Sequence, residues 1–149
     1  MKINSINELE KFAYKLKENL KPSDVVNLIG DLGAGKTTLV QKIGKYMNVK
    51  SDIVSPTFAL VNIYDGDIRI YHLDLYRLED EDQILDIDFE TYLYPQDEIT
   101  FIEWSNKAES YMPDDMINIE IKKLSENERE IIIEKNTKRG IEINENIGN

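Results

Sequence analysis

One short stretch of the chain combines residue types and spacing that suit the binding of phosphate. It reads Gly30-Asp31-Leu32-Gly33-Ala34-Gly35-Lys36-Thr37-Thr38, which fits the pattern glycine, four residues, glycine, lysine, then serine or threonine. Small residues let the backbone curl so that successive N–H groups point inward at a β-phosphate. Lys36 would bridge β- and γ-oxygens, and Thr37 would place its hydroxyl on Mg²⁺. The stretch therefore predicts a nucleotide-binding loop, against the simpler interpretation of a glycine-rich turn with an incidental lysine.

The segments on either side of this loop have the patterns needed to position it. Residues 24–29 have the pattern of a short buried strand, and residues 38–47 place Leu39, Ile43 and Met47 on one helical face. Upstream, Ser5-Ile6-Asn7-Glu8 is a capping-box pattern that predicts a helix ending before Pro22. Strand, loop and helix thus follow one another in the order that a phosphate-binding loop requires.

The rest of the chain predicts a mixed α/β fold. We expect one hairpin from residues 58–64 and 68–73, another from 117–124 and 129–135, and a buried strand over 98–103. Residues 80–88 and 105–111 are predicted to be short helices. Together these elements predict a P-loop NTPase-like three-layer sandwich, with a partly parallel sheet and added antiparallel hairpin strands. The polar tail, 136–149, is expected to be loosely held.

Length and composition limit the possible classes of protein. With 149 residues, 41% of them hydrophobic, residues 1–149 can build one core and form a single domain. The sequence has no apolar run near the roughly 20 residues of a membrane span and no apolar segment at its start, so we expect a cytoplasmic protein without membrane contact. Without cysteine and with one histidine, any metal must be held by oxygen ligands.

Charge argues against direct binding of nucleic acid. The formal net charge is −11, and the sequence lacks a stripe of lysine or arginine that could attract a phosphate backbone locally. Carboxylates gather between residues 79 and 90. They form either a solvated helix surface or a strip that docks a basic partner.

A carboxylate at the end of the predicted strand 98–103 completes the candidate chemistry. Phosphoryl chemistry needs a metal anchored on the protein, and the usual second anchor is an acid at the end of an apolar strand beside the loop. Glu103 has this position, directly after Phe101-Ile102 and before Trp104. The sequence leaves open whether Glu103 would bind Mg²⁺ through water or polarise the attacking water.

Four motifs together resemble the TsaE family of small bacterial ATPases. They are the stretch 30–38, Ser55-Pro56-Thr57-Phe58, His72-Leu73-Asp74-Leu75-Tyr76-Arg77 and Ile102-Glu103-Trp104. The resemblance spans about residues 5–135. It implies ATP and Mg²⁺ binding, slow ATP hydrolysis, and dependence on the partner proteins TsaB and TsaD. It also implies a supporting role in threonylcarbamoyl transfer to the adenine beside the anticodon of tRNA, which the chain would reach only through the complex.

The same resemblance assigns expected roles to single residues. Lys36, Asp74 and Glu103 are expected to be catalytic, and Thr37 and Glu103 to hold the metal. The residues expected to bind the nucleotide are Asp31, Leu32, Gly33, Ala34, Gly35, Lys36, Thr37, Thr38, Thr57 and Arg129. Thr57 and Asp74 resemble residues of switch-like segments near the γ-phosphate, and Arg129 resembles an arginine lying against the adenine. The structural alternatives are a proline-containing strand entrance for Thr57, a polar network with His72 and Tyr76 for Asp74, and an exposed hairpin charge for Arg129.

The residues also bear on three other functions. Asn106-Lys107-Ala108-Glu109 resembles a guanine-reading motif but has glutamate in place of the final aspartate, which argues against a GTPase. A small-molecule kinase usually carries a lid with several arginines, whereas the four arginines here are scattered. The strongest rival is an assembly factor that binds ATP without productive hydrolysis. Phosphate release with and without partners would separate it from a partner-dependent ATPase.

Overall fold

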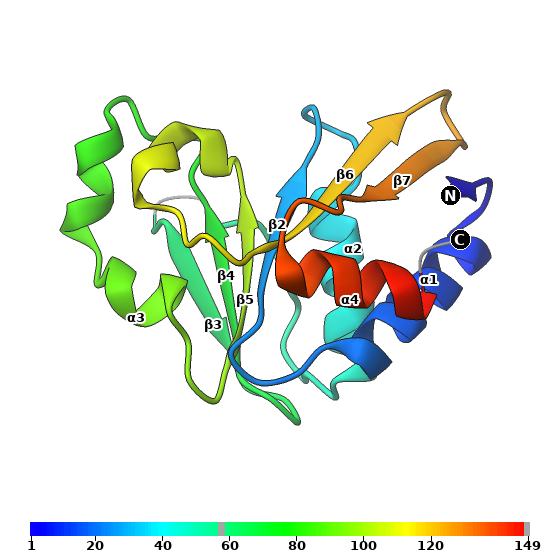
Figure 1. Cartoon of the computed structure of the whole chain (residues 1–149), viewed down its shortest axis with the longest axis horizontal. Coiled ribbons are helices and arrows are strands. Elements are labelled where there is room, and N and C mark those ends of the chain that lie inside the picture. Colours follow the sequence, from blue (N-terminus) through cyan, green and yellow to red (C-terminus); the bar gives the residue numbers. More distant parts are fainter. Residues whose placement is uncertain (57–58, 148–149) are drawn as a thin grey trace.

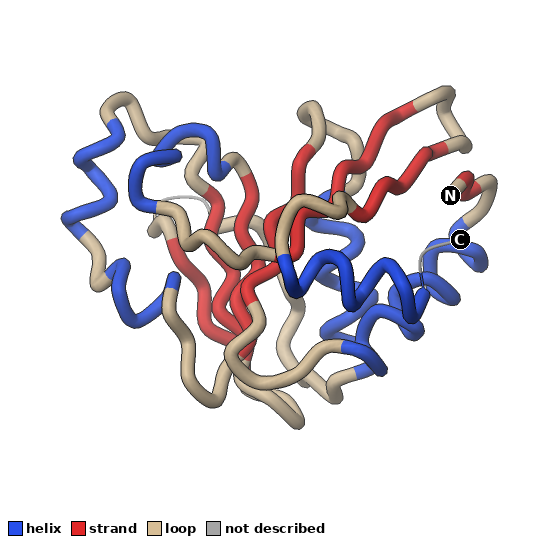
Figure 2. The backbone as a smooth tube through the Cα atoms, in the orientation of Figure 1, coloured by secondary structure: helices blue, strands red, loops and turns tan. Residues whose placement is uncertain are grey.

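A seven-stranded mixed sheet with helices on both faces forms the framework (Figures 1 and 2). The computed structural model describes residues 1–56 and 59–147. The strands are β1 (Lys2–Ile3), β2 (Val25–Ile29), β3 (Val61–Tyr64), β4 (Ile70–Asp74), β5 (Ile99–Glu103), β6 (Ile117–Lys123) and β7 (Arg129–Ile133). The helices are α1 (Ile6–Asn19), α2 (Lys36–Tyr46), α3 (Phe89–Leu93) and α4 (Lys138–Ile147), with 3₁₀ helices η1 (Glu81–Asp86) and η2 (Ser105–Tyr111).

The order of the strands confirms a partly parallel sheet with antiparallel additions. Across the sheet the order is β1-β7-β6-β2-β5-β4-β3. The central strands β6, β2, β5 and β4 are parallel, whereas β3, β7 and β1 pair antiparallel with their neighbours. Parallel strands bring their carboxyl ends to one edge. At that edge Glu103 lies opposite both Leu28 and Asp74.

Alternation of side chains along the central strands produces two cores, one on each face. Val26 and Leu28 of β2 pack into the core that includes residues of α1, α2 and α4. Val25 faces the opposite way, into the core with Ile84 of η1 and Leu93 of α3. This alternation is the period-two pattern of a strand buried on both faces. The sheet is therefore the middle of three layers, as predicted.

The first helix begins as the sequence indicates, with one difference in its cap. The Ser5 hydroxyl accepts a hydrogen bond from the Glu8 N–H at 3.2 Å. The Glu8 carboxylate accepts from the N–H of Asn4 at 2.6 Å, rather than from that of Ser5 as in the usual box. Beyond α1, the predicted hairpins are present as β3–β4 and β6–β7. β1 and α3 were not predicted, and Phe58 of the first predicted hairpin lies outside the described residues.

The expectation of a loosely held tail over 136–149 is wrong for residues 138–147, and residues 148–149 lie outside the described residues. Residues 138–147 form α4, which packs beside α1 (Figure 1). Ile143 is fully buried, and the Arg139 guanidinium donates to both carboxylate oxygens of Asp24 at 2.8 and 2.9 Å. A bidentate pair of this kind is geometrically specific, so it fixes α4 against the start of β2. In the described part of the chain, none of the helices has the length and apolar character needed to cross a membrane.

Candidate nucleotide-binding site

The predicted phosphate loop connects β2 to α2, and its backbone has the conformation that glycine permits. Gly35 has a φ of +111°, in the left-handed region that side chains disfavour. Gly30 is required for a different reason, because a Cβ there would lie 2.6 Å from the carbonyl oxygen of Ile121 in β6. The loop is closed by a hydrogen bond from the Ala34 N–H to the Asp31 carbonyl at 3.0 Å. The positive φ of Gly35 and the close packing of Gly30 on β6 therefore explain why these two positions are glycine.

Lys36, the first residue of α2, is held over the loop by two contacts. Its Nζ atom donates to the Gly30 carbonyl at 2.5 Å and lies 3.8 Å from the centre of the Trp104 ring. Only 4% of Lys36 is exposed, and burial lowers the pKa of its ammonium, opposed by the negative charges of Glu103, Asp74 and Asp31. Trp104 itself has a φ of +60°, which is unusual for a bulky residue. This backbone turn directly after β5 is what places the indole against the ammonium group.

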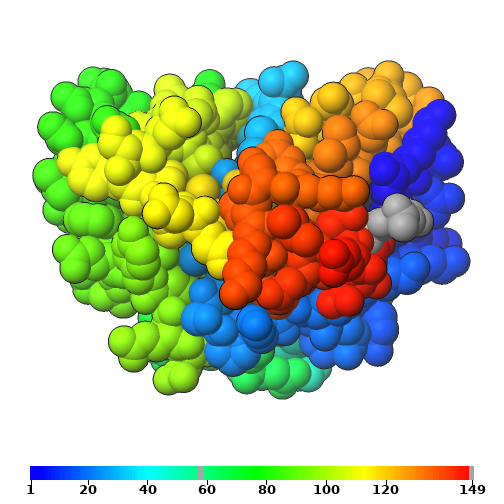
Figure 3. All heavy atoms as spheres, in the orientation of Figure 1, coloured from blue at the N-terminus to red at the C-terminus, as the bar shows by residue number. Residues whose placement is uncertain are grey.

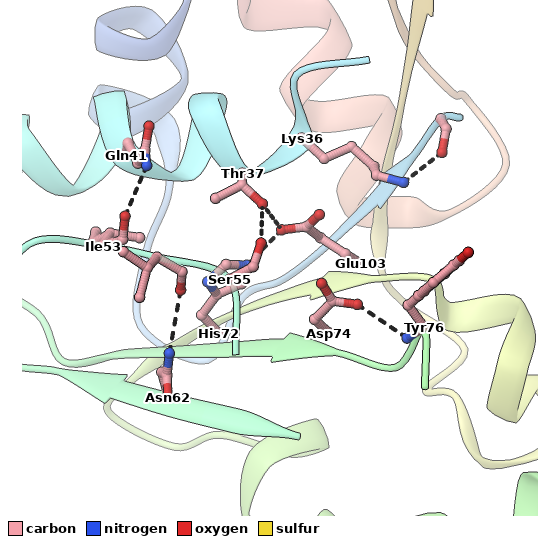
Figure 4. Close-up of polar contacts among 12 residues, drawn as sticks. Lys36, Thr37, Gln41, Ile53, Ser55, Asn62, His72, Asp74, Tyr76 and Glu103 are labelled. Carbon is pink, nitrogen blue, oxygen red and sulfur yellow. Dashed lines mark hydrogen bonds and ion pairs between the residues drawn. The ribbon is translucent and has the colours of Figure 1, made fainter. Parts of the chain in front are cut away.

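Glu103 is the centre of a hydrogen-bonded group of side chains at the end of β5 (Figure 4). Its Oε2 atom accepts from the Thr37 hydroxyl at 2.7 Å and lies 2.7 Å from Nε2 of His72. Thr37 also lies 2.8 Å from the Ser55 hydroxyl. Because the single Thr37 hydrogen goes to Glu103, Ser55 donates to Thr37. The chain of contacts thus runs from Ser55 through Thr37 and Glu103 to His72.

His72 contacts Glu103 from the buried side and orients its carboxylate. It is fully buried, and among the described residues its Nδ1 atom has no hydrogen-bond partner. A carboxylate only accepts hydrogen bonds, so the hydrogen lies on Nε2 and His72 donates to Glu103. The register of the strands explains this contact. β4 and β5 are parallel with Asp74 opposite Glu103, and His72 lies two residues before Asp74 on the same face of the sheet.

Asp74 ends β4 beside Glu103 and is half-buried. Burial raises the pKa of its carboxyl group and so does the charge of Glu103, whereas the N–H of Tyr76, which donates to Oδ1 at 3.0 Å, lowers it. The Tyr76 side chain points away to the surface, where its ring packs 4.9 Å from that of Trp104. The predicted grouping of His72, Asp74 and Tyr76 is therefore only partly correct, because the third side chain leaves the shared face.

The structure brings most of the expected residues to one edge of the sheet. Lys36, Thr37, Asp74 and Glu103 lie together there (Figure 4). Asp31, Leu32 and Gly33 form the exposed turn of the loop, and Thr38 follows in the first turn of α2. Thr57 lies outside the described residues. The guanidinium of Arg129 contacts the loop itself, through the carbonyl oxygen of Ala34.

Two features of the site were not assigned from the sequence. One is Ser55, which precedes Thr57 in its motif and bonds to Thr37. The other is the contact of Trp104 with Lys36, for which the only available signal was a tryptophan directly after the strand-ending Glu103.

A cavity adjoins the loop and extends along the uncovered part of the sheet. Its volume is about 840 Å³, and it is lined by Gly30, Lys36 and Trp104 at one end and by Asn27 and Asn118 along the strands. Figure 3 shows this face hollowed between the yellow segment that contains η2 and the orange strands β6 and β7. A volume of this size is typical of small-molecule sites.

A glycine-containing loop joins a buried strand to a helix, the helix starts with lysine and threonine, and the neighbouring strand ends with an acid. These features define a phosphate-loop protein. Comparison with known proteins identifies which kind. The profile of the family described as "Threonylcarbamoyl adenosine biosynthesis protein TsaE" matches residues 3–131, and the chain belongs to this family.

Curated relatives and a solved structure agree with this assignment. A protein of Rickettsia typhi named tRNA threonylcarbamoyladenosine biosynthesis protein TsaE is 38% identical over 89% of this chain and 92% of its own length. A Bacillus subtilis protein of the same name is 39% identical over 74% of this chain and 69% of its own length. The crystal structure of YdiB from Bacillus subtilis superposes with a TM-score of 0.81 at 28% identity, covering 99% of this chain and 91% of that one.

Proposed function

We propose that this protein is a Mg²⁺-dependent ATPase that supports the synthesis of threonylcarbamoyladenosine in tRNA and depends on TsaB and TsaD. Its membership of the TsaE family supports the pathway. The observation that carries the chemistry is the 2.7 Å hydrogen bond between Thr37, at the start of α2, and Glu103, at the end of β5. These residues are 66 positions apart, and they meet where a phosphate loop would present the β- and γ-phosphates.

The side chains at this point fit a magnesium ion. A hydroxyl and a carboxylate are hard oxygen donors of the kind that Mg²⁺ binds together with substrate phosphates. Thr37 and Glu103 would hold the ion, which would supply charge stabilisation at the phosphate oxygens. His72 supports this role by fixing the carboxylate from the buried side.

The remaining residues bind and orient the substrate. The N–H groups of the loop would face the β-phosphate of ATP, and the positive end of α2 would favour its negative charge. Lys36 would exchange the Gly30 carbonyl and the Trp104 ring for phosphate oxygens. Asp74, half-buried beside Glu103, would orient the attacking water.

Phosphate release tests the proposal directly. The purified chain should release phosphate from MgATP slowly, and addition of purified TsaB and TsaD should increase the rate. If the partners assemble with the chain only when ATP is present and phosphate release stays absent in every mixture, the assembly-factor function replaces the ATPase. A chain that does not bind ATP at all contradicts both.

The protein should reach tRNA only through its partners, in the cytoplasm where tRNA is modified. With a net charge of −11 the free chain should repel a phosphate backbone. The test is the binding of unmodified tRNA to the chain alone at physiological salt, compared with binding to the mixture with TsaB and TsaD. Micromolar or tighter binding to the chain alone would contradict this part of the proposal.

A further inference from the structure

The guanidinium group of Arg129, the first residue of β7, donates hydrogen bonds to backbone carbonyls. Its Nε atom donates to the Ala34 carbonyl in the phosphate loop at 2.8 Å, across 95 positions of sequence. Its Nη1 atom donates to the carbonyls of Ser125 and Glu128, at 2.8 and 3.0 Å. One side chain thus ties the turn between β6 and β7 to the loop between β2 and α2.

We propose that Arg129 is a positioning residue that orients the peptide between Ala34 and Gly35, so that the Gly35 N–H faces the phosphate. The inference rests on the proposed function, because it assumes that this loop binds the phosphates of a nucleotide. In a trans peptide the C=O and N–H bonds point to opposite sides, so holding the Ala34 oxygen on the Arg129 side turns the Gly35 hydrogen away from Arg129.

The conformation of the loop makes this constraint necessary. Gly35 has a φ of +111°, and glycine samples both signs of φ with little difference in energy. A loop with this freedom can rotate its peptides and lose the convergence of N–H groups that binds an anion. A charged donor on the outward carbonyl opposes that rotation, and a hydrogen bond with a charged partner is stronger than a neutral one.

The support behind Arg129 is firm enough for this role. Its backbone lies between two strands, opposite Ile3 of β1 and Lys123 of β6. The same hairpin contacts the loop at a second point, where the Ile121 carbonyl would lie 2.6 Å from a Cβ on Gly30. The β6–β7 hairpin therefore backs the loop at both its start and its middle.

A direct contact with the nucleotide base is the competing role, and a ligand without a base separates the two. Inorganic tripolyphosphate with Mg²⁺ offers the phosphate chain alone. If Arg129 acts through the loop, its replacement lowers the affinities for MgATP and for tripolyphosphate by the same factor. If Arg129 contacts adenine, only the affinity for MgATP falls.

The experiment compares Arg129→Met with Arg69→Met by isothermal titration calorimetry. Arg69 is a matched control because it carries the same charge, and its guanidinium is exposed and paired with Asp65. We expect Arg129→Met to weaken both ligands about tenfold, the size expected for loss of a hydrogen bond with a charged donor. Arg69→Met should leave both affinities unchanged. Unchanged tripolyphosphate affinity in a folded Arg129→Met protein overturns the proposal.

Two further measurements keep the outcome decisive. In the wild-type protein the amide resonance of Gly35 should shift when tripolyphosphate is added, and this shift should shrink in the variant. If Arg129→Met does not fold, Arg129→Gln takes its place, since glutamine stays polar but lacks the charged donor and the fork that reaches Ala34 and Ser125 together. Wild-type tripolyphosphate affinity in a folded Arg129→Gln protein overturns the proposal. A wild-type chain that binds neither ligand refutes the proposed function instead, and the positioning role falls with it.

Discussion

Replacement of Glu103 by glutamine separates the charge of this carboxylate from its place in the fold. Glu103 is 3% exposed, and its Oε2 atom accepts from Thr37 and His72, both at 2.7 Å. In Glu103→Gln the amide oxygen has the same position and accepts the same two hydrogen bonds, while the negative charge is lost. We therefore expect the stability to stay within about 1 kcal/mol of the wild-type value, because no buried donor loses its acceptor.

Hydrolysis should respond much more strongly than stability. Loss of one group that stabilises charge in the transition state typically lowers the rate by about 10²–10³, or roughly 2.7–4 kcal/mol in the barrier. We expect a decrease of this size in single-turnover hydrolysis of MgATP by Glu103→Gln. ATP affinity without Mg²⁺ should be retained, because the loop and Lys36 are intact.

Glu103→Ala is the matched comparison for the structural role. It removes the acceptor of His72, which is fully buried and cannot turn to water. An unsatisfied buried donor costs about 1–3 kcal/mol, so Glu103→Ala should be less stable than Glu103→Gln by that amount in urea denaturation. Wild-type hydrolysis by Glu103→Gln would refute the metal-binding role. Equal stability of the two variants would refute the support that His72 gives to Glu103.

Three other substitutions test the remaining parts of the site and fold. Lys36→Ala should weaken MgATP binding by about tenfold or more while the protein stays folded, since the ammonium would bind phosphate; calorimetry that shows unchanged affinity removes Lys36 from the site. Asp74→Asn should be more stable than the wild type at neutral pH. Burial raises the pKa of Asp74 in the folded state above its ordinary value of 3.8, so the wild type loses stability as the pH rises from 3.8 through the folded pKa, and the variant does not. The stability advantage of Asp74→Asn should vanish in denaturation below pH 3.8. An equal advantage at neutral pH and below pH 3.8 would contradict the expected direction of the pKa shift. Ile143→Ala should cost about 2–4 kcal/mol because Ile143 is fully buried, whereas a cost near zero in urea denaturation would mean that α4 contributes little to the fold.

The sequence predicted those parts of the structure that depend on neighbouring residues. The loop, its strand and its helix are contiguous, so glycine spacing and apolar periodicity were enough to place Lys36 and Thr37. Glu103 could be placed because an acid at the end of an apolar strand reaches the edge where parallel strands end. Local patterns and one rule of topology therefore determine the positions of Lys36, Thr37 and Glu103.

The rest depends on contacts between distant residues, which periodicity does not encode. The helix α4 was missed because its segment is polar apart from a few isoleucines, and Arg139 gains its partner Asp24 across 115 positions. The role of His72 required the register of β4 against β5. Likewise, Arg129 looks like a surface charge in sequence, and its contact with Ala34 follows only from the position of the β6–β7 hairpin.

The contacts of Lys36 connect the candidate phosphate site to the surface of the protein. Its ammonium lies 3.8 Å from the centre of the Trp104 ring, and that ring packs on Tyr76, which is 49% exposed. A phosphate that draws Lys36 away removes a cation–π contact from Trp104, an interaction worth about 0.5–2 kcal/mol. Trp104 keeps its packing on Tyr76 and on the core beside it. A partner that contacts Tyr76 would therefore touch a side chain linked to Lys36 through the Trp104 ring, which gives the proposed dependence on partners a route through three adjacent side chains.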